Sequence, residues 1–201
     1  MKLVVITPEP LVPGEPAVLA QLFASGLERC HLRKPSASRA QLKAFVEEVP
    51  EQFRTRLVLH SYHQLVAALG LGGRHWRDDF HAPLAPPAGA GLTSRSCHDL
   101  ATLRAALGHY SCAFFGPVLP SISKPGHAPS AGQSQVELAA LLTARPAATG
   151  RTDVFALGGV TAEAVPRCRA LGFDGVAVVG AVWHSADPLG AFRHLQAAVL
   201  Q

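Results

Sequence analysis

The chain has 201 residues, of which 48% are hydrophobic and 16% charged, so it can bury a full-sized core and is not intrinsically disordered. Its formal charge is +4, but the basic residues are scattered, which argues against a nucleic-acid-binding stripe and fits an anionic small ligand. No apolar run approaches the roughly 20 residues of a membrane-spanning helix, and four cysteines without a CxxC pair indicate reduced thiols. We therefore expect one cytoplasmic domain over residues 1–201.

Eight short runs of β-branched and other apolar residues predict eight strands. In chain order the runs are 3–6, 27–32, 57–59, 73–76, 92–96, 112–115, 154–157 and 176–179. Continuous apolar runs of this kind are typical of a parallel sheet that helices cover.

Between most of these runs, apolar residues recur at helical spacing, which predicts helices. The start and stop signals lie at Pro16 and Gly26 for the first helix, at a Ser134-x-x-Glu137 capping box for a later one, and at Asp187-Pro188 for the last. Strands that alternate with helices predict an α/β fold.

Eight such units predict a single (β/α)8 TIM barrel, and an open Rossmann-like sheet of six or seven units is the alternative. The fourth crossover, at residues 81–91, is rich in Pro, Gly and Ala, so its helix is predicted to be short or missing. A long loop at residues 117–133 carries Lys124 and His127 and is predicted to act as a functional lid.

The loops after strands seven and eight of a TIM barrel often bind phosphate. Here they contain Gly158 and Gly159, and Gly180. Glycines let backbone N–H groups approach an anion closely, and a following helix adds its positive dipole end. A Gly-Gly pair by itself can be only a tight turn, but its position after strand seven favours the phosphate site.

Other strand ends carry histidines, at His31, His60, His75 and His98. Imidazole suits zinc, iron and nickel, so a metal site is one hypothesis. Because alternate strands supply a given layer of a barrel, histidines on neighbouring strands need not converge. We expect most of them to form a hydrogen-bonded pocket wall and one to act as a general acid or base.

Three further residues carry possible chemistry. The planar guanidinium of Arg33 suits phosphate or pyrophosphate, and Lys124 is a mobile point charge that could fold over the same anion. Cys97 could be a nucleophile, but no base is tied to it by a motif, so a partly buried, inert thiol is the better interpretation.

Four motifs occur along the chain in a fixed order: His31-Leu32-Arg33-x-Pro35, Ser96-Cys97-His98, FGPVxPSxSK at 115–124 and ALGGV at 156–160. Through them the chain resembles the thiamine phosphate synthase/TenI family over nearly its whole length. The resemblance implies a TIM barrel of thiamin biosynthesis. Synthases of the family join a pyrimidine, carried as its pyrophosphate, to a thiazole phosphate and release pyrophosphate with the help of Mg²⁺, whereas TenI-type members catalyse an aromatising proton shift on the thiazole phosphate carboxylate.

The resemblance also suggests roles for individual residues. It assigns pyrophosphate binding to Arg33, Ser96 and Lys124, and thiazole phosphate binding to Gly159 and Gly180. The complete set of expected site residues is Lys124, Arg33 and His98 as catalytic groups, His31, Ser96, His60, Gly158, Gly159 and Gly180 as substrate-binding groups, and Asp79 as a metal ligand.

The sequence departs from the family pattern in two places. His60-Ser61-Tyr62 stands where the synthases carry one of their two magnesium-binding carboxylates, and Pro117 stands where TenI-type proteins carry a histidine. Three hypotheses follow: a transferase of the thiamine phosphate synthase type with an altered metal site, a thiazole tautomerase, or a non-enzymatic binder of a phosphate ester. All three predict small phosphate ligands and no nucleic-acid partner or membrane, and a homo-oligomer is left open.

Overall fold

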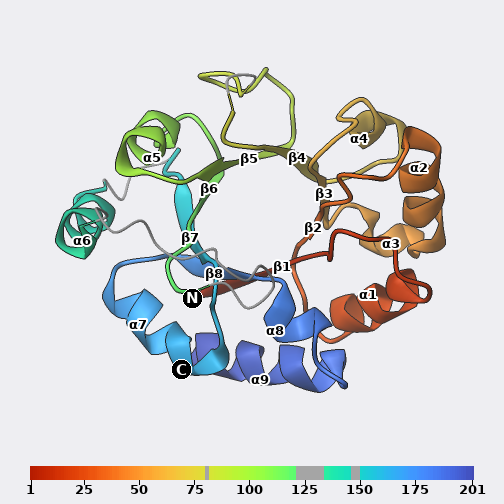
Figure 1. Ribbon diagram of the computed structural model, residues 1–201. Helices are drawn as coiled ribbons and strands as arrows, with labels where there is room; N and C mark the ends of the chain where they lie inside the picture. Colours follow the sequence, from red (N-terminus) through yellow and green to blue (C-terminus); the bar gives the residue numbers. More distant parts are fainter. Residues whose placement is uncertain (80–81, 121–133, 146–149) are drawn as a thin grey trace.

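The computed structural model describes residues 1–79, 82–120, 134–145 and 150–201. Eight parallel strands form a closed barrel in which each strand pairs with its neighbours in the sequence, and helices surround the ring (Figure 1). The barrel closes where β1 pairs with β8, with Lys2 opposite Gly175 and Val5 opposite Val178. The predicted (β/α)8 barrel is therefore confirmed, and the open sheet is wrong because it would leave β1 and β8 apart.

The strands are β1 (Lys2–Ile6), β2 (Cys30–Leu32), β3 (Leu57–Leu59), β4 (Gly73–Trp76), β5 (Leu92–Cys97), β6 (Cys112–Phe115), β7 (Asp153–Leu157) and β8 (Gly175–Val178). The helices are α1 (Glu15–Ala24), α2 (Arg39–Glu48), α3 (Glu51–Arg54), α4 (Leu65–Ala68), α5 (Leu100–Ala106), α6 (Gln135–Thr143), α7 (Val165–Ala170), α8 (Gly180–Trp183) and α9 (Pro188–Leu200), with a 3₁₀ turn at Ala162–Ala164. None of the helices within the described residues is long and apolar enough to cross a membrane.

Side-chain caps fix several of the helix starts. Ser134 Oγ accepts the backbone N–H of Glu137 at the start of α6, and Asp187 Oδ1 accepts that of Gly190 at the start of α9, as the sequence signals predict. Between β4 and β5, the described residues 77–79 and 82–91 contain no helix. The expected loss of the fourth crossover helix is therefore confirmed.

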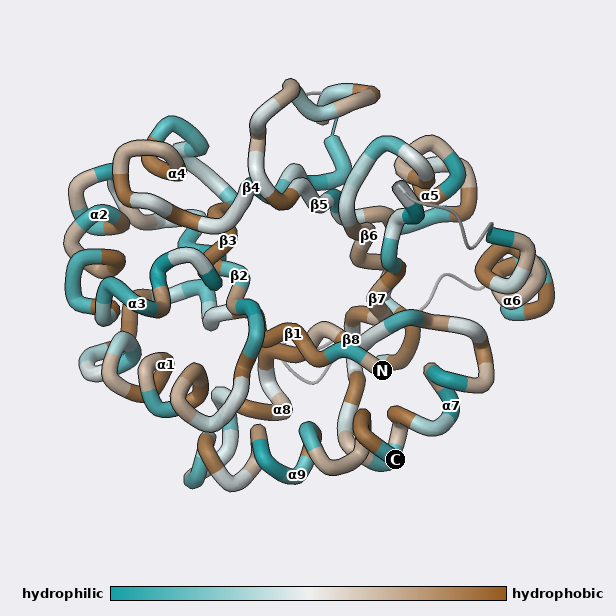
Figure 2. Tube along the Cα trace, turned by 180° about the vertical axis from the view of Figure 1, so that it is seen from behind, coloured by the Kyte–Doolittle hydropathy of each residue, from teal (hydrophilic) through white to brown (hydrophobic). Residues whose placement is uncertain are grey.

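Two sets of buried side chains alternate along the strands. One set, which includes Cys30, Leu32, Leu57 and Leu59, faces the helices and belongs to the main core. The other fills the barrel interior, and its apolar members come mainly from β1 and β6–β8, with Val58 from β3: Val4, Ile6, Val58, Cys112, Phe114, Phe155 and Ala177. In Figure 2, hydrophobic residues predominate at β1 and β6–β8 of the ring, whereas β4 and β5 carry more hydrophilic residues, and the two kinds alternate along the surrounding helices. The side of the barrel interior formed by β1 and β6–β8 is thus an apolar wall.

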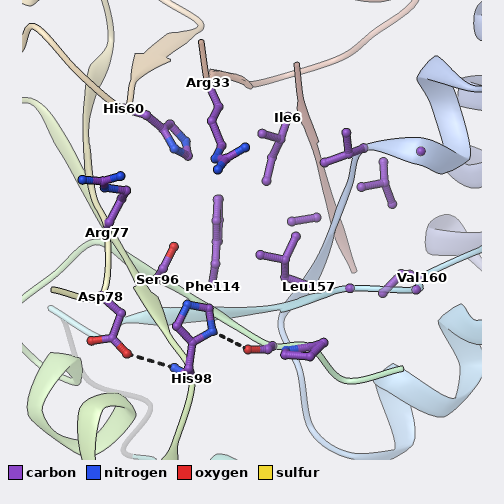
Figure 3. A pocket seen from close by; sticks show the side chains of 18 of the residues that line it. Ile6, Arg33, His60, Arg77, Asp78, Ser96, His98, Phe114, Leu157 and Val160 are labelled. Atoms are coloured by element: carbon purple, nitrogen blue, oxygen red, sulfur yellow. Dashed lines mark hydrogen bonds between the residues drawn. The ribbon is translucent and has the colours of Figure 1, made fainter. Parts of the chain in front are cut away.

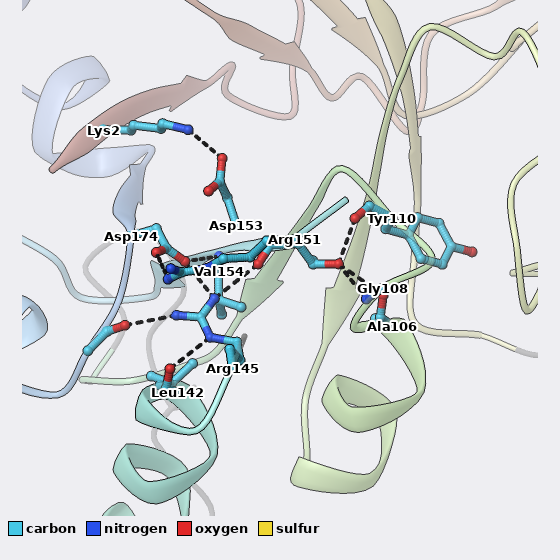
Figure 4. A network of polar contacts seen from close by, with 12 residues as sticks. Lys2, Ala106, Gly108, Tyr110, Leu142, Arg145, Arg151, Asp153, Val154 and Asp174 are labelled. Carbon is cyan, nitrogen blue, oxygen red and sulfur yellow. Dashed lines mark hydrogen bonds and ion pairs between the residues drawn. The ribbon is translucent and has the colours of Figure 1, made fainter. Parts of the chain in front are cut away.

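The N-terminal end of the barrel is held by a polar network around Arg145 (Figure 4). The buried guanidinium donates to the carbonyl oxygens of Leu142, Thr152 and Gly172 and pairs with Asp174 Oδ2 at 2.6 Å. Leu142 lies in the last turn of α6, Thr152 lies just before β7, and Gly172 and Asp174 lie just before β8, so one side chain ties the three elements together. This network lies at the end of the barrel opposite the carboxyl ends of the strands, where TIM barrels carry stability rather than chemistry.

Candidate active site

A cavity of ≈ 540 Å³ opens at the carboxyl ends of the strands (Figure 3). Every strand, or the loop that follows it, contributes to its lining: Ile6, Arg33, His60, Arg77, Ser96, Gly116, Gly158 and Gly180. Asp79, His98 and Gly159 also line it. His31 is buried in contact with His60, and Lys124 lies outside the described residues, as does His127 of the expected lid. Most of the expected site residues thus lie around one cavity.

The two glycines after β7 have backbone conformations that side chains rarely adopt. Gly158 has φ 92° and Gly159 has φ 68°. A Cβ on Gly159 would lie 2.2 Å from the carbonyl oxygen of Pro120, and one on Gly158 would lie 2.8 Å from Pro117 Cα. The close approach of an anion is the reason for these glycines that the sequence suggests. The structure adds a second reason: the loop after β6 packs directly on them. On the far side of β8, Gly180 is the first residue of α8, where backbone N–H groups have no partner within the helix.

Arg33 and its neighbour Lys34 have separate roles. The Arg33 side chain reaches into the cavity (Figure 3). Its guanidinium forms an ion pair with Glu9. Lys34 is fully buried, and its ammonium donates to Glu15 Oε1 and Oε2 at 2.8 and 2.6 Å and to the carbonyl oxygens of Pro8 and Pro10. The residue types alone favour a lysine exposed to solvent at the end of β2, but Lys34 is buried. This lysine fixes the loop between β1 and α1, which holds Glu9 beside Arg33.

His98 is held by two contacts at the edge of the cavity. Its Nδ1 lies 2.7 Å from the carbonyl oxygen of Gly116, and its backbone N–H donates to Asp78 Oδ2 at 3.2 Å. A carbonyl oxygen can only accept, so Nδ1 carries the proton and Nε2 is the basic nitrogen of the neutral ring. Asp78 is held in turn by Arg95 at 3.3 Å. The expected metal ligand, Asp79, lies on the same wall, 3.5 Å from the Arg77 guanidinium.

Three histidines converge on the polar side of the barrel interior. His31 Nδ1 lies 3.2 Å from His60 Nε2, and the rings of His60 and His75 stack with their centroids 3.9 Å apart. His75 is anchored by two hydroxyl groups, with Nδ1 2.8 Å from Ser94 Oγ and Nε2 2.9 Å from Ser96 Oγ. Ser96, an expected pyrophosphate ligand, thus also holds the cluster in place.

All three histidines are neutral at physiological pH. Burial lowers the pKa of His75 to about 3, and the nearby His63 and Arg33 act in the same direction. Burial also lowers the pKa values of His31 and His60 well below that of an ordinary imidazole, and the neighbouring histidines lower them further. The cluster therefore presents lone pairs rather than positive charge.

The expectation that histidines on neighbouring strands need not meet is wrong here, and the strand register gives the reason. Leu59 of β3 pairs with Leu32 of β2 and with Arg74 of β4. His60 follows Leu59 directly and His75 follows Arg74, so these two histidines stand level. His31 lies opposite Val58, two residues before His60, and so on the same interior face. Knowing this register would have predicted the contact, but apolar runs alone do not fix it.

Cys97 is not a nucleophile in this structure. Its side chain is buried, and burial raises the pKa of the thiol to about 12. The interpretation of Cys97 as an inert thiol is supported, because only the thiolate is reactive.

Comparison with known proteins identifies the family. The family model described as thiamine monophosphate synthase matches residues 3–182, which is most of the chain. The chain belongs to this family. The expected resemblance is thereby confirmed, and so is the family role in thiamin biosynthesis.

Individual relatives agree with the family match. The thiamine-phosphate synthase of Salinispora tropica is 38% identical over 150 residues, covering 72% of this chain and 68% of the relative. That of Methylobacillus flagellatus is 32% identical over 183 residues, covering 88% and 82%. Among solved structures, thiamine phosphate pyrophosphorylase from Bacteroides thetaiotaomicron superimposes with a TM-score of 0.77 at 25% identity, covering 98% of this chain and 95% of that one.

Proposed function

We propose that the protein is a transferase of the thiamine phosphate synthase type, which joins a pyrimidine, carried as its pyrophosphate, to a thiazole phosphate. The observation that carries the proposal is the family match over residues 3–182, combined with a cavity that has Arg33 on one side and the glycine loops after β7 and β8 on the other. Two substrates, one with a pyrophosphate and one with a phosphate, need two such anion-binding regions in one cavity.

In the proposed reaction, the bond between the pyrimidine methylene carbon and the pyrophosphate oxygen breaks. Pyrophosphate keeps the electron pair, and the thiazole nitrogen forms the new bond to the methylene carbon. Arg33 and Ser96 would bind the leaving pyrophosphate and stabilise the charge that it gains. Lys124 is assigned to the same task by the resemblance, and Gly158, Gly159 and Gly180 would bind the phosphate of the thiazole.

The apolar half of the cavity supports a reaction with a cation-like pyrimidine. Ile6, Phe114 and Leu157 are the apolar side chains from β1, β6 and β7 that line the cavity. Apolar side chains at this position exclude water, which would otherwise capture the activated methylene carbon and waste the substrate. His60 would contribute a neutral hydrogen-bonding group to the wall that faces the pyrimidine, with His31 buried behind it in contact with His60.

The donor set does not fit a magnesium ion held by carboxylates from two strands. Mg²⁺ prefers hard oxygen ligands in octahedral geometry. The carboxylates of Asp78 and Asp79 both come from the loop after β4, and both are in contact with arginines, Arg95 and Arg77. The end of β3 supplies only the imidazole of His60. Asp79 remains the proposed ligand for any Mg²⁺ that binds, and no step of the reaction is assigned to that ion here.

His98 favours a second candidate function, the aromatising proton shift on a thiazole phosphate carboxylate. Its basic Nε2 is fixed by the donation of Nδ1–H to Gly116, and the ring lies at the cavity edge. A neutral histidine with a fixed tautomer is suited to remove and return a proton. His98 would then replace the base that Pro117 cannot supply.

Incubation with defined substrates tests the proposal. The purified protein is supplied with pyrimidine pyrophosphate, thiazole phosphate and Mg²⁺ in one reaction and with the non-aromatic thiazole phosphate carboxylate in a second, and the products are separated by chromatography. Thiamin phosphate together with an equal amount of pyrophosphate supports the transferase. Conversion of the non-aromatic thiazole carboxylate without condensation supports the tautomerase, and binding of thiazole phosphate without either reaction indicates a non-enzymatic binder.

A further inference from the structure

The three-histidine cluster of His31, His60 and His75 brings metal-binding atoms together from β2, β3 and β4. One nitrogen from each ring lies within 4.8 Å of the other two. In the part of the chain that the structure describes, it is the one group of three or more His, Cys, Asp or Glu side chains with this spacing. We propose that His31, His60 and His75 bind one divalent transition-metal ion of the zinc, cobalt and nickel class, with an open coordination position toward the cavity.

The spacing of the nitrogens is close to that of a bound ion. Metal–nitrogen distances of about 2.0–2.1 Å place the ligand atoms of a tetrahedral site about 3.4 Å from one another. The pair His31 Nδ1 and His60 Nε2 already stands at 3.2 Å. The longest separation within the cluster is at most 4.8 Å, so a change of about 1.4 Å completes the site. His60 lies at the cavity and is only partly buried, so of the three rings it has the most room to turn.

One nitrogen in the cluster has no partner that the described residues provide. His31 Nε2 is buried and makes no hydrogen bond there. Burying a polar atom without a hydrogen-bond partner is unfavourable, so native proteins rarely keep one without a specific reason. The His31 nitrogen that faces His60 is Nδ1, so the metal ligand assigned to this ring is Nδ1, and Nε2 lies on the other side of the ring.

The surroundings of His75 resemble the outer shell of a metal site. Metal-binding histidines commonly donate their second ring nitrogen to an oxygen, which fixes the ring orientation. His75 has Ser94 Oγ at 2.8 Å from one nitrogen and Ser96 Oγ at 2.9 Å from the other. One serine hydroxyl can therefore accept the N–H of His75, while the ion replaces the other hydroxyl as the partner of the second ring nitrogen. Phe114, with ring centroids 4.6 Å from His31 and 5.2 Å from His75, backs the cluster with an apolar surface.

The donor chemistry selects the class of metal. Three imidazole nitrogens suit zinc, cobalt and nickel, whereas Mg²⁺ prefers oxygen ligands and binds imidazole poorly. Three protein ligands leave a fourth position for water or substrate, which is the arrangement of catalytic rather than structural zinc sites. Because His60 lines the cavity and the other two rings are fully buried, an ion reaches the cluster from the cavity side. This inference does not depend on which reaction the protein catalyses.

Cobalt and zinc binding to the full-length protein, with any affinity tag removed, tests the inference. After equilibrium dialysis, elemental analysis is expected to give one Zn²⁺ per chain, and Co²⁺ is expected to produce the intense visible bands of a four-coordinate nitrogen site. Excess Mg²⁺ is expected to leave both unchanged. Weak bands typical of hydrated octahedral Co²⁺, or less than one Zn²⁺ per chain, would overturn the proposal.

Variants locate the ion. His60→Ala and His31→Gln are expected to bind Zn²⁺ at least tenfold more weakly, because each loses one ligand. His194→Ala removes an exposed histidine that lies outside the cluster and is expected to bind as the unmodified protein does. His31 is fully buried, so thermal unfolding confirms that each variant is folded, and the partly buried His60 supplies the variant least dependent on packing. Equal zinc affinity in all four proteins would overturn the assignment.

Discussion

His98 donates its Nδ1–H to the carbonyl oxygen of Gly116 over 2.7 Å, and this contact sets which ring nitrogen is basic. The consequence is a test of the tautomerase candidate. His98→Gln keeps a donor for Gly116 but has no basic nitrogen, so the proton shift on the thiazole carboxylate should slow by about 10²–10⁴-fold, mainly in kcat. His109→Gln, at an exposed position, is the matched control and should keep the full rate. An unchanged rate in His98→Gln would remove His98 from the reaction.

Arg33 provides a test of the pyrophosphate region. Arg33→Ala should weaken pyrophosphate binding by about 1.5–3 kcal/mol, the range for hydrogen bonds to charged groups, while thiazole phosphate binding stays nearly intact. Isothermal titration calorimetry with each ligand measures both effects. Arg39→Ala removes the same charge at an exposed position and should change neither. The same titrations on Lys124→Ala test the role that the resemblance assigns to that lysine, and equal losses for both ligands would contradict two separate anion regions.

Substitution of Gly159, in the loop after β7, tests whether that loop binds the thiazole phosphate. Gly159→Ala forces a Cβ to within 2.2 Å of the Pro120 carbonyl oxygen at φ 68°, so we expect a loss of stability and at least tenfold weaker binding of thiazole phosphate. Gly108→Ala is the matched control, because Gly108 has φ 79° and nothing lies within 4 Å of an added Cβ. The control should lose only about 1 kcal/mol of stability and no affinity. If thiazole phosphate binds equally to both variants, the loop after β7 is not the phosphate site.

Much of the fold is predictable from residues that act locally. The predicted runs place seven of the eight strands within one residue at each end. Most of these strands are continuous apolar runs, as buried parallel strands usually are, whereas β4 and β5 carry several polar residues. The exception is β2, which begins at Cys30 rather than at residue 27 because Leu27 and the two residues after it lie before the paired segment. The capping residues Ser134 and Asp187 likewise mark helix starts, since their hydroxyl or carboxylate bonds to the nearby backbone.

The site was only partly predictable, because its key contacts depend on strand register and on long-range packing. Position after a strand brings Arg33, Ser96 and Gly159 to one cavity, which follows from the barrel alone. The meeting of His31, His60 and His75 needs the register across β2, β3 and β4, which apolar runs do not determine.

The Arg145 network predicts a loss of stability without a loss of catalysis. Arg145→Ala removes a buried cation from Asp174 and from three carbonyl oxygens, so the free energy of unfolding should fall by about 3–5 kcal/mol. Arg151→Ala removes the more exposed partner of the same carboxylate and should cost about 1 kcal/mol or less. Urea unfolding measures both values. At a temperature where both variants are folded, their KM values should equal that of the unmodified protein, and a changed KM would contradict a purely structural role.

The most direct measurement of the central claim is the stoichiometry of products when pyrimidine pyrophosphate and thiazole phosphate are mixed with the protein. Separate reactions contain Mg²⁺, Mn²⁺ or Co²⁺, and thiamin phosphate and pyrophosphate are quantified in each. The account predicts that both products appear in a 1:1 ratio in at least one of these reactions and that Arg33→Ala slows their formation. Absence of thiamin phosphate with every metal ion, from protein that still binds thiazole phosphate, would contradict the transferase.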